Sequence, residues 1–562
     1  MAEIRSVLLV HPALPSNPRH KRILPLGLLY LGAYLRRERP NIRTTIIDAH
    51  ILNLSLDDVA DRILQAQPDL VGMGYWTAQA PFARDLSAKL KASQPGIIIV
   101  HGGVHPTSCP EEAAQWSDLV LMHEAENELV ELTDRLNRGE DGSLTSGAAV
   151  WRNGGLQTQP PAPFISDLDS LPLPAWDMVP IERYDTPLHV VGGRRLPIIA
   201  SRGCPYNCAF CVSPLIWKRK LRWRSGRSVA AEMAEAGQRL GINQFHFWDD
   251  NLLINPEVVN DMCNEIIDRR LDVRWVALTR AEHVVRHADM LRLLRNAGCI
   301  GIEIGIESAD PKALQYYAKD QSLGTVEQAM RLQRQAGMTP LYTLMAFSPG
   351  ETLSGYYFQT RFINRLTRNA RAHRLFVGQF ATAYPGTRFY QEASQQGQLL
   401  VQGWDSFHHH NIKFLPHSLL DDVPELTVNR LRIQDVFVLL LESYLWRYDV
   451  HPNGFDRGRA RQEYAALSAL VKLIDGRRSV RTIGGEIAKL AVWDEAESLR
   501  FAAFTLMIMA QAGLARSAGQ RYDEEVRPRA VSFNRWYANV VYRGLAAAAL
   551  TGMDQLVPAC RS

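Results

Sequence analysis

Three cysteines stand close together in a chain of 562 residues, in the segment Ser201-Arg-Gly-Cys-Pro-Tyr-Asn-Cys-Ala-Phe-Cys-Val212. Cys204, Cys208 and Cys211 are three of only seven cysteines in the chain. Packing gives buried thiols no reason to share one loop, whereas thiolates that bind one metal centre must come together. Three thiolates at these spacings can hold three corners of a four-iron, four-sulfur cluster. The fourth iron then stays open to another ligand, and chemistry would begin there.

A zinc ion is the main alternative partner for these thiols. A structural zinc site needs a fourth protein ligand. The sequence has no second cysteine pair at zinc spacing, and the nearest histidine, His246, falls on an expected strand. The spacing therefore favours an iron–sulfur cluster.

The bulk composition limits the other possibilities. The 63 basic and 59 acidic residues nearly balance, at a net charge of +4, so the chain lacks the basic excess typical of nucleic-acid binding. The remaining cysteines are widely scattered, which argues against a disulfide framework and for a reducing compartment. Ile4–Val10 is too short and strand-like for a secretory signal. Phe501–Ala515 comes closest to a membrane span but is short, so we expect a buried helix there and a cytoplasmic protein.

The cysteine loop needs a scaffold, and two series of alternating elements could supply it. In residues 1 to 140 the apolar runs lack polar alternation, as in a parallel α/β sheet buried on both faces. The expected strands are 7–10, 44–47, 70–73 and 97–100, and the expected helices are 26–36, 56–66 and 82–91. Such sheets bind ligands at the carboxyl ends of their strands.

Residues 141 to 190 are rich in Gly, Pro and polar residues, so we expect a linker that packs along the surface. A second β/α series then begins and predicts a partial or full parallel barrel, with the cysteine loop at the carboxyl end of its first strand. Its expected strands are 198–200, 245–248, 274–278, 300–306, 341–346 and 375–380. Three of its expected helices are 229–240, 290–296 and 326–336. A further helix is expected after Asn255, which can cap it, and Val259, Met262, Cys263 and Ile266 form its apolar stripe. The chain beyond residue 411 reads as mostly helical.

The cysteine loop resembles the signature of the radical S-adenosylmethionine (SAM) superfamily, which places an aromatic residue, here Phe210, before the last cysteine. The resemblance continues at the ends of later strands. It implies SAM contacts from Asp249 and Asp250 to the methionine amino group, from Arg280 to the carboxylate, and from Glu307 and Ser308 near the ribose. Segments 348–352 and 384–387 are similar to later motifs of the family.

The first domain resembles the cobalamin-binding domain that one large class of radical SAM enzymes carries. The matching stretches are 24–35, 46–48, 68–72, 102–107 and, in the linker, 169–175. The resemblance covers roughly residues 5 to 415. It implies a Rossmann-like (flavodoxin-like) cobalamin-binding domain at 1–140, a linker at 141–190, a radical SAM barrel at 191–410 and a helical C-terminal domain at 411–562. The cobalamin contacts that it implies are His11, Asp48, Trp76, Thr77, Gly102, Gly103, His105 and Glu124.

The first domain departs from its relatives in two places. Methyl-carrying cobalamin proteins have an Asp-x-His-x-x-Gly motif after the first strand, but this chain reads His11-Pro-Ala-Leu-Pro-Ser-Asn17 there. We therefore predict no histidine ligand to cobalt, with Trp76 covering the lower face; ordinary core packing is the alternative for Trp76. His123-Glu-Ala-Glu126 stands where the family has Gly-Glu-Gly-Glu, so a different local backbone is expected.

Two later segments are less telling. His408–His410 could suggest a metal site, but neighbouring residues on a strand point to opposite faces, so a structural or substrate-facing role is preferred. Residues 470–480 with 509–514 weakly resemble small winged-helix domains that bind peptides, and the alternative is a helical cap over the barrel.

Together the resemblances imply a cobalamin-dependent radical SAM C-methyltransferase. Its cofactors would be a 4Fe-4S cluster, SAM and methylcobalamin, and a 5′-deoxyadenosyl radical would take hydrogen from an unactivated carbon of a small-molecule or peptide natural-product precursor. No protein acid or base is assigned, because the cofactors carry the hard chemistry. A low-potential flavodoxin or ferredoxin would supply electrons. A ring cyclase or oxidoreductase without methyl transfer, like the anaerobic chlorophyll-ring cyclase, and a non-catalytic cobalamin sensor are the alternatives. A sensor need not keep the cysteine triplet.

Overall fold

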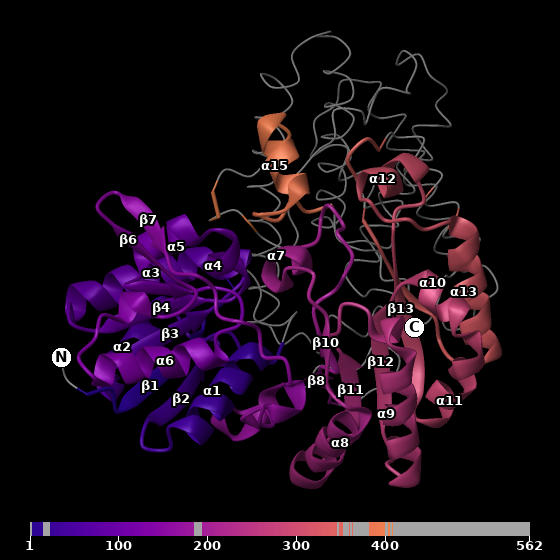
Figure 1. The fold of residues 1–562 in the computed structure, drawn as a ribbon, viewed down its shortest axis with the longest axis horizontal. Coiled ribbons are helices and arrows are strands. Elements are labelled where there is room, and N and C mark those ends of the chain that lie inside the picture. The colour runs from indigo at the N-terminus through magenta and orange to yellow at the C-terminus, as the bar shows by residue number, and fades with distance from the viewer. Residues whose placement is uncertain are drawn as a thin grey trace, which may run out of the picture. The chain divides into compact units, whose positions relative to one another are not determined.

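The computed structural model describes residues 3–14, 23–184, 194–345, 348–351 and 381–399, with a few single positions between 359 and 407. The described helices and strands are labelled in Figure 1, and the chain divides into two compact units whose boundaries pass through one strand and two helices. The first unit comprises residues 1–303, 329–338 and 384–391, and the second comprises 304–328, 339–383 and 392 onward. Each unit is described by itself.

The first unit opens with a seven-stranded sheet in the order β2-β1-β3-β4-β5-β6-β7. Strands β1 to β5 pair in parallel, and their order 2-1-3-4-5 is that of the flavodoxin-like fold. The fold expected for the first domain is therefore confirmed. The strands are β1 (Ser6–His11), β2 (Arg43–Asp48), β3 (Leu70–Gly74), β4 (Ile98–Gly102), β5 (Leu119–Leu121), β6 (Ala148–Arg152) and β7 (Gly155–Thr158).

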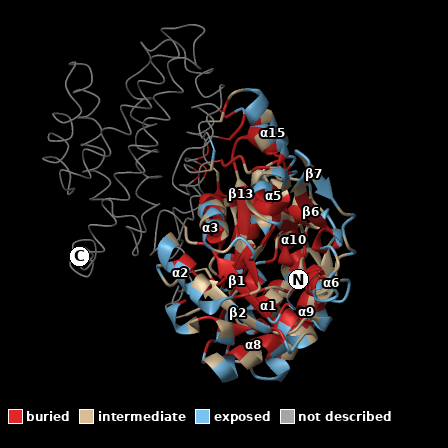
Figure 2. Ribbon diagram, turned by 90° about the vertical axis from the view of Figure 1, so that its left-hand side faces the viewer, coloured by how far each residue is buried: buried red, intermediate tan, exposed pale blue. Residues whose placement is uncertain are grey.

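Helices pack on both faces of this sheet and make its core. All six residues of β1 are buried, as expected for a strand covered on both sides (Figure 2). Leu9, Leu28, Leu70 and Leu129 belong to one apolar cluster between the strands and helices. The helices are α1 (Leu26–Glu38), α2 (Leu56–Ala66), α3 (Ala80–Ser93), α4 (Val104–Ser108), α5 (Pro110–Trp116) and α6 (Glu126–Asn137). Strand β5 and helices α4 to α6 were not predicted from the sequence.

The hairpin of β6 and β7 lies in the range expected to be a linker. Both strands pair antiparallel and extend the sheet past residue 140. Asn153 and Gly154 join them, with φ values of 53° and 77°. An Asn-Gly pair with two positive φ values is the favoured two-residue hairpin turn. The first sheet therefore continues to Thr158, and only the chain after it can serve as a connection.

The connection from residue 165 to 184 packs along the first unit. The backbone N–H of Ala175 donates to the carbonyl of Leu29 at 3.2 Å, and the Tyr184 hydroxyl donates to Asp48 at 2.6 Å. At its middle, the Asp169 carboxylate accepts from the backbone N–H of Ser225 at 3.0 Å. This segment runs over the surface as expected, with contacts to both sides.

The second sheet has the order β14-β13-β12-β11-β8, and β8, β11 and β12 pair in parallel. Strands that follow one another in chain order form an arc of a (β/α) barrel, whereas an open doubly wound sheet reverses its order. The five strands are β8 (Leu196–Ile198), β11 (Gln244–Phe247), β12 (Arg274–Thr279), β13 (Cys299–Glu307) and β14 (Leu341–Leu344), and a small antiparallel pair is β9 (Ser201–Arg202) with β10 (Arg222–Trp223).

The helices of this series follow the sequence closely. The Asn255 side chain accepts from the N–H of Val258 and caps α9, whose buried residues are the four of the expected stripe. A Cβ on Gly226 would stand 2.1 Å from the backbone nitrogen of Met262, so glycine lets α8 and α9 pack closely. The helices are α7 (Ser213–Trp217), α8 (Gly226–Leu240), α9 (Pro256–Asp268), α10 (Ala281–Arg286), α11 (Leu291–Asn296), α12 (Pro311–Tyr316), α13 (Leu323–Gln335) and α15 (Arg388–Gln395).

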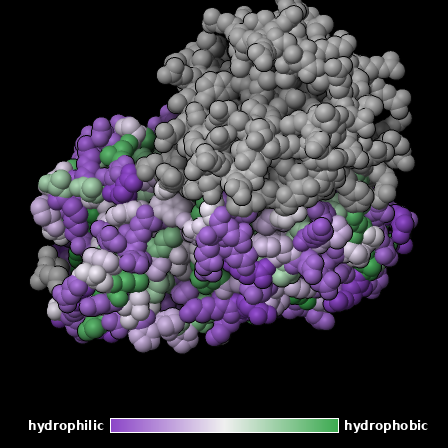
Figure 3. All heavy atoms as spheres, turned by 90° about the horizontal axis from the view of Figure 1, so that it is seen from above, coloured by the Kyte–Doolittle hydropathy of each residue, from purple (hydrophilic) through white to green (hydrophobic). Residues whose placement is uncertain are grey.

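Several expectations fall outside the described residues: the strand at 375–380, His408–His410, the helical domain from 411 and the winged-helix resemblance. Within the described part, no helix is long and apolar enough to cross a bilayer. The described surface seen in Figure 3 is mainly hydrophilic, with apolar side chains scattered over it.

Candidate functional site

A cavity of about 390 Å³ opens at the carboxyl ends of β1, β3, β4 and β5 in the first unit. Ligands of flavodoxin-like sheets bind at this edge. One part of its wall comes from the first sheet and α1, with His11, Leu24–Leu28, Gly74–Trp76, Gly102–Val104 and His123–Glu126. The other part comes from the second β/α series, with Ile199, Ser201–Gly203, Ile216, Trp217, Trp248 and Asp250. The cavity therefore joins the expected cobalamin domain to the residues that lead directly into the cysteine loop.

The cysteine loop starts from a glycine that no other residue can replace without a clash. Gly203 has a φ of 96°, and a Cβ there would lie 2.2 Å from the carbonyl oxygen of Lys220. Beyond it the loop folds on itself, because the N–H of Cys211 donates to the carbonyl of Cys208 at 3.1 Å. The N–H of Ser213 then donates to the Cys211 sulfur at 3.4 Å.

The three cysteines suit a cluster better than a single ion. All three are partly buried, and burial raises the pKa of Cys204 to about 11 and the pKa of Cys211 still further. Ligands of one zinc ion must converge on a point, whereas each thiolate of a cluster binds a different iron. Among the described residues, the one group of three whose ligand atoms lie within 4.8 Å of one another is elsewhere, at His105, Cys109 and Glu112. The donor set therefore fits an iron–sulfur cluster.

Arg280, the expected partner of the SAM carboxylate, lies against the cysteine loop. Its guanidinium sits over the ring of Tyr206, 4.1 Å from the centroid, and pairs with Glu282. The Tyr206 hydroxyl lies 3.0 Å from Nε2 of His283. A cation over an aromatic face is attracted by the ring quadrupole. The end of β12 and the start of α10 thus hold the loop through Tyr206, which the sequence did not single out.

The two aspartates after β11 have different positions. Asp249 is turned inward, where its carboxylate accepts from the N–H of Ala200 at 3.1 Å and from the Ser201 hydroxyl at 2.5 Å. Burial raises its pKa to about 6. Asp250 lines the cavity, accepts from the Ser213 hydroxyl at 2.5 Å and also has a pKa raised by burial. The geometry therefore favours Asp250 as the ligand-facing carboxylate and Asp249 as the tie between β8 and β11.

Glu307 and Ser308 belong to the second unit. Glu307 has a φ of 63° and accepts from the Lys319 ammonium at 2.7 Å. Ser308 is fully buried, and its hydroxyl accepts from the N–H of Asp310 at 3.0 Å. Both side chains are thus held within their own unit. Phe210 lies in the turn between Cys208 and Cys211.

A buried ion network connects the two walls of the cavity. The Arg202 guanidinium donates to Glu124 at 2.6 Å and to Glu126 at 2.7 Å. Arg222 donates to the same Glu124 carboxylate at 2.8 Å and to the carbonyl of Ile165 at 2.7 Å. Burial by itself would raise the pKa of Glu126, but the Arg202 charge holds it below its usual value. Two acids and two arginines balance, so the buried charges are paired.

His123 carries a backbone conformation that glycine normally adopts. Its φ is 65°, in the left-handed region, whereas Ala125 has an unstrained φ of −138°. A histidine therefore occupies a left-handed position here, and the expected difference from the Gly-Glu-Gly-Glu backbone stays a prediction. A non-glycine residue in this region is strained and persists where surrounding contacts hold it. Here Nδ1 of His123 lies 2.9 Å from the carbonyl of Ile216.

Three histidines line the cavity, and in two of them both ring nitrogens face another side chain. Gln79 donates from Nε2 to Nε2 of His11 at 2.9 Å, and its own orientation is fixed because its Oε1 accepts from the N–H of Trp76. Nδ1 of His11 therefore carries the hydrogen and faces Asp48 at 3.1 Å. His101 contacts Tyr75 and Ser87, each at 2.9 Å.

The structure separates the other expected cobalamin residues into two groups. Trp76, Gly102, Gly103 and Glu124 line the cavity. A Cβ on Gly103 would lie 2.9 Å from the backbone nitrogen of Tyr75, so glycine lets these two backbone segments pack closely in the cavity wall. The second group, Asp48, Thr77 and His105, is buried behind the lining.

Arg202, Arg222, Glu126, Tyr206 and Ser213 were not predicted as site residues. Arg202 could have been predicted to have a buried partner, because it closely follows the expected apolar strand 198–200 and buried arginines are paired. The partners themselves lie 76 and 78 positions earlier in the chain, and no local pattern indicates such a pairing.

Both parts of the chain that line the cavity match known protein families. The B12 binding domain model matches residues 19–133, and the radical SAM superfamily model matches residues 198–356. An uncharacterized methyltransferase of Pyrococcus horikoshii is 28% identical over 416 residues, which are 72% of this chain and 86% of the relative. The anaerobic magnesium-protoporphyrin IX monomethyl ester cyclase of Synechocystis is 29% identical over 339 residues, 59% of this chain and 66% of the cyclase.

Among solved structures, the radical SAM methyltransferase TsrM of Kitasatospora setae, with cobalamin and a [4Fe-4S] cluster bound, superposes with a TM-score of 0.60 at 18% identity. The match covers 92% of this chain and all of TsrM. At this identity the likeness shows that the fold is shared.

Proposed function

The chain belongs to the cobalamin-dependent radical SAM enzymes, and we propose that it is a C-methyltransferase that acts on an unactivated carbon of a small molecule or peptide. One observation carries the proposal. A single cavity is lined by the strand ends of the cobalamin-type domain and by Ser201–Gly203, which directly precede Cys204. A methyl donor and a radical source must both reach the same substrate carbon, and this arrangement lets them share one space.

The residues that would hold each cofactor come from different walls. Cys204, Cys208 and Cys211 would hold the cluster, and Asp250 and Arg280 would bind SAM at its open iron. Trp76, Gly102 and Gly103 would hold cobalamin. When bound, these cofactors supply reductive cleavage of SAM and a transferable methyl group.

The chain's own residues position these groups and keep water out. The network of Arg202 with Glu124 and Glu126 fixes the cysteine loop relative to the cobalamin-type domain. Trp76, Trp217 and Trp248 give the cavity large apolar walls, which lower the local dielectric.

Incubation of the reconstituted enzyme with methyl-labelled SAM tests the proposal once a substrate is in hand. We expect label in the product and 5′-deoxyadenosine formed alongside it. The variant with all three cysteines changed to alanine should form neither, and turnover by that variant would exclude the mechanism.

A radical ring closure without methyl transfer is the second candidate, and the likeness to the magnesium-protoporphyrin cyclase favours it. Both reactions form 5′-deoxyadenosine, so only the methyl label separates them. Deoxyadenosine with unlabelled product supports the cyclase. A cobalamin sensor would form no deoxyadenosine at all.

Further features of this proposal concern partners and place. We propose a low-potential flavodoxin or ferredoxin as electron donor, no nucleic-acid partner and a cytoplasmic location, on the grounds of the cluster chemistry and the scattered cysteines. We also propose that residues 411 to 562 contribute to substrate choice.

A further inference from the structure

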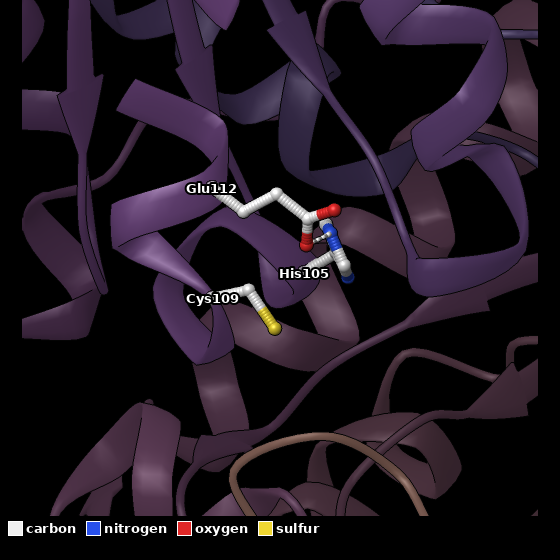
Figure 4. A group of neighbouring side chains, drawn as sticks. All are labelled: His105, Cys109 and Glu112. Carbon is white, nitrogen blue, oxygen red and sulfur yellow. Dashed lines mark ion pairs between the residues drawn. The ribbon is translucent and has the colours of Figure 1, made fainter. Parts of the chain in front are cut away.

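A histidine, a cysteine and a glutamate lie close together where α4 meets α5 (Figure 4). His105 lies in α4, Cys109 joins α4 to α5, and Glu112 lies in the first turn of α5. One nitrogen, one sulfur and one carboxylate oxygen from these side chains all lie within 4.8 Å of one another. We propose that they form a binding site for a divalent metal ion, with zinc as the best fit. The site is separate from the cluster cysteines and does not depend on the proposed function.

One pair of donor atoms is close to the spacing of a formed zinc site, and all three donors lie within 4.8 Å of one another. Zinc bonds to nitrogen and oxygen are about 2.0–2.2 Å, so two such ligands on a tetrahedral ion stand about 3.3–3.6 Å apart. Nε2 of His105 and Oε2 of Glu112 are 3.8 Å apart. The Glu112 side chain is 37% exposed and can approach by a small rotation, whereas His105 is fully buried and already held.

The chemical types of the three donor atoms indicate which metal ion would bind. Imidazole, thiolate and carboxylate together are typical of zinc, whereas calcium and magnesium prefer oxygen ligands only. Three protein ligands leave one tetrahedral position, which a water molecule can fill because Glu112 reaches solvent.

The surroundings orient the histidine as a ligand. Nδ1 of His105 lies 3.3 Å from the Thr77 hydroxyl, so this nitrogen can donate its hydrogen there. Nε2 is then the nitrogen with the lone pair, and it faces Glu112. The rings of Tyr75 and Trp116 also pack near His105, with centroids 5.7 Å and 6.4 Å away. A hydrogen bond from the second ring nitrogen, as to Thr77 here, fixes the ring orientation of histidines that bind metals.

The place of the site lets the ion brace the junction of two helices, while its open fourth position distinguishes it from a closed structural zinc site with four protein ligands. Helix α4 begins directly after Gly103, which lines the cavity, and the ion would join α4 to α5. A bond network across this junction would hold the wall formed by Gly102–Val104 in place. Thr77 and His105, expected as cobalamin contacts, would then act from behind that wall.

The metal content of the full-length protein tests the inference. After zinc loading and removal of excess metal, we expect one tightly bound zinc per chain by elemental analysis. Cys109→Ser and Glu112→Gln should each weaken zinc binding at least about tenfold, while Cys263→Ala, at a buried cysteine of α9, should not. The iron content after cluster reconstitution should be the same in all four proteins. Zinc absent from the wild type, or retained fully by Cys109→Ser, overturns the inference.

Cobalt substitution gives a second readout that a merely structural cysteine would not produce. In cobalamin-free protein with Cys204, Cys208 and Cys211 changed to alanine, added Co²⁺ should show a thiolate-to-cobalt absorption band that zinc displaces. The band should vanish on adding Cys109→Ser, with circular dichroism confirming that both proteins are folded. A band that survives Cys109→Ser places the metal on another thiol and excludes this site.

Discussion

The Arg202 guanidinium lies 2.6 Å from the Glu124 carboxylate, and both side chains are almost completely buried. Arg202 stands two residues before Cys204, while Glu124 follows β5 of the first sheet. Glu126 binds the second edge of the same guanidinium at 2.7 Å. The position of the cysteine loop relative to the first sheet is therefore set by charge pairing in a dry environment.

Replacing Arg202 with methionine should destabilise the protein strongly. Glu126 would be left buried without its arginine, and breaking a buried pair in this way costs about 3–5 kcal/mol. Arg152→Met is the matched control, because Arg152 and Asp141 are about half exposed and such pairs contribute about 0–1 kcal/mol. Urea unfolding measures both, and equal losses in the two variants would contradict the importance of burial.

Gly203→Ala should prevent cluster assembly. The new Cβ would collide with the Lys220 carbonyl and the φ of 96° would be strained, so the loop must move and the thiols with it. Gly154→Ala provides the control, since its φ is also positive at 77° but no atom lies within 4 Å of the added carbon. We expect iron per chain to fall to background in Gly203→Ala and to stay at the wild-type level in Gly154→Ala, with similar circular dichroism.

The raised pKa of Glu128 predicts that the free energy of unfolding falls as pH rises. Burial, with help from the nearby Glu126 and Glu124 charges, raises its pKa from 4.5 to about 8. The folded state therefore binds more protons than the unfolded state between these pH values, and folding weakens by up to about 4–5 kcal/mol across that window. Glu128→Gln lacks this titration.

The gap in unfolding free energy between Glu128→Gln and wild type should widen in favour of the variant from pH 5 to pH 9. Urea titrations at several pH values measure it. A gap that stays constant would show that Glu128 titrates normally in the folded protein.

Cobalt in the bound cobalamin should lack a nitrogen ligand from the protein. Nε2 of His11 accepts a hydrogen bond from Gln79 and its Nδ1 faces Asp48 at 3.1 Å, while both ring nitrogens of His101 are hydrogen-bonded. Electron paramagnetic resonance of the Co(II) form reports such a ligand as nitrogen hyperfine splitting, and we expect none. Splitting that disappears in His123→Gln would identify His123 as the ligand, and splitting that survives would contradict the hydrogen bonds assigned to the other two histidines.

The local parts of the fold could be read from the sequence because local rules determine them. The α9 helix is an example: its cap at Asn255, its first-turn Pro256 and its apolar stripe all lie within one short segment. The Asn153-Gly154 turn was also readable, but the surrounding Gly and Pro residues favoured a linker. The partners of Glu124 were not readable, because they lie 78 and 98 residues further along and are brought near only by the packing of two sheets.

The segment from residue 165 to 184 acts as a rigid connection between the two halves of the first unit, the first sheet and the second β/α series. Its N–H at Ile165 binds Glu124, its Asp169 holds the start of α8, and its Tyr184 hydroxyl binds Asp48 behind the cavity. A flexible linker would let the cobalamin-type domain move relative to the second β/α series, whereas a segment held at three points restrains that movement. We therefore expect these contacts to fix the distance between the two proposed cofactor sites in the first unit. Adding residues to this segment should uncouple the two sites even though every cofactor ligand remains.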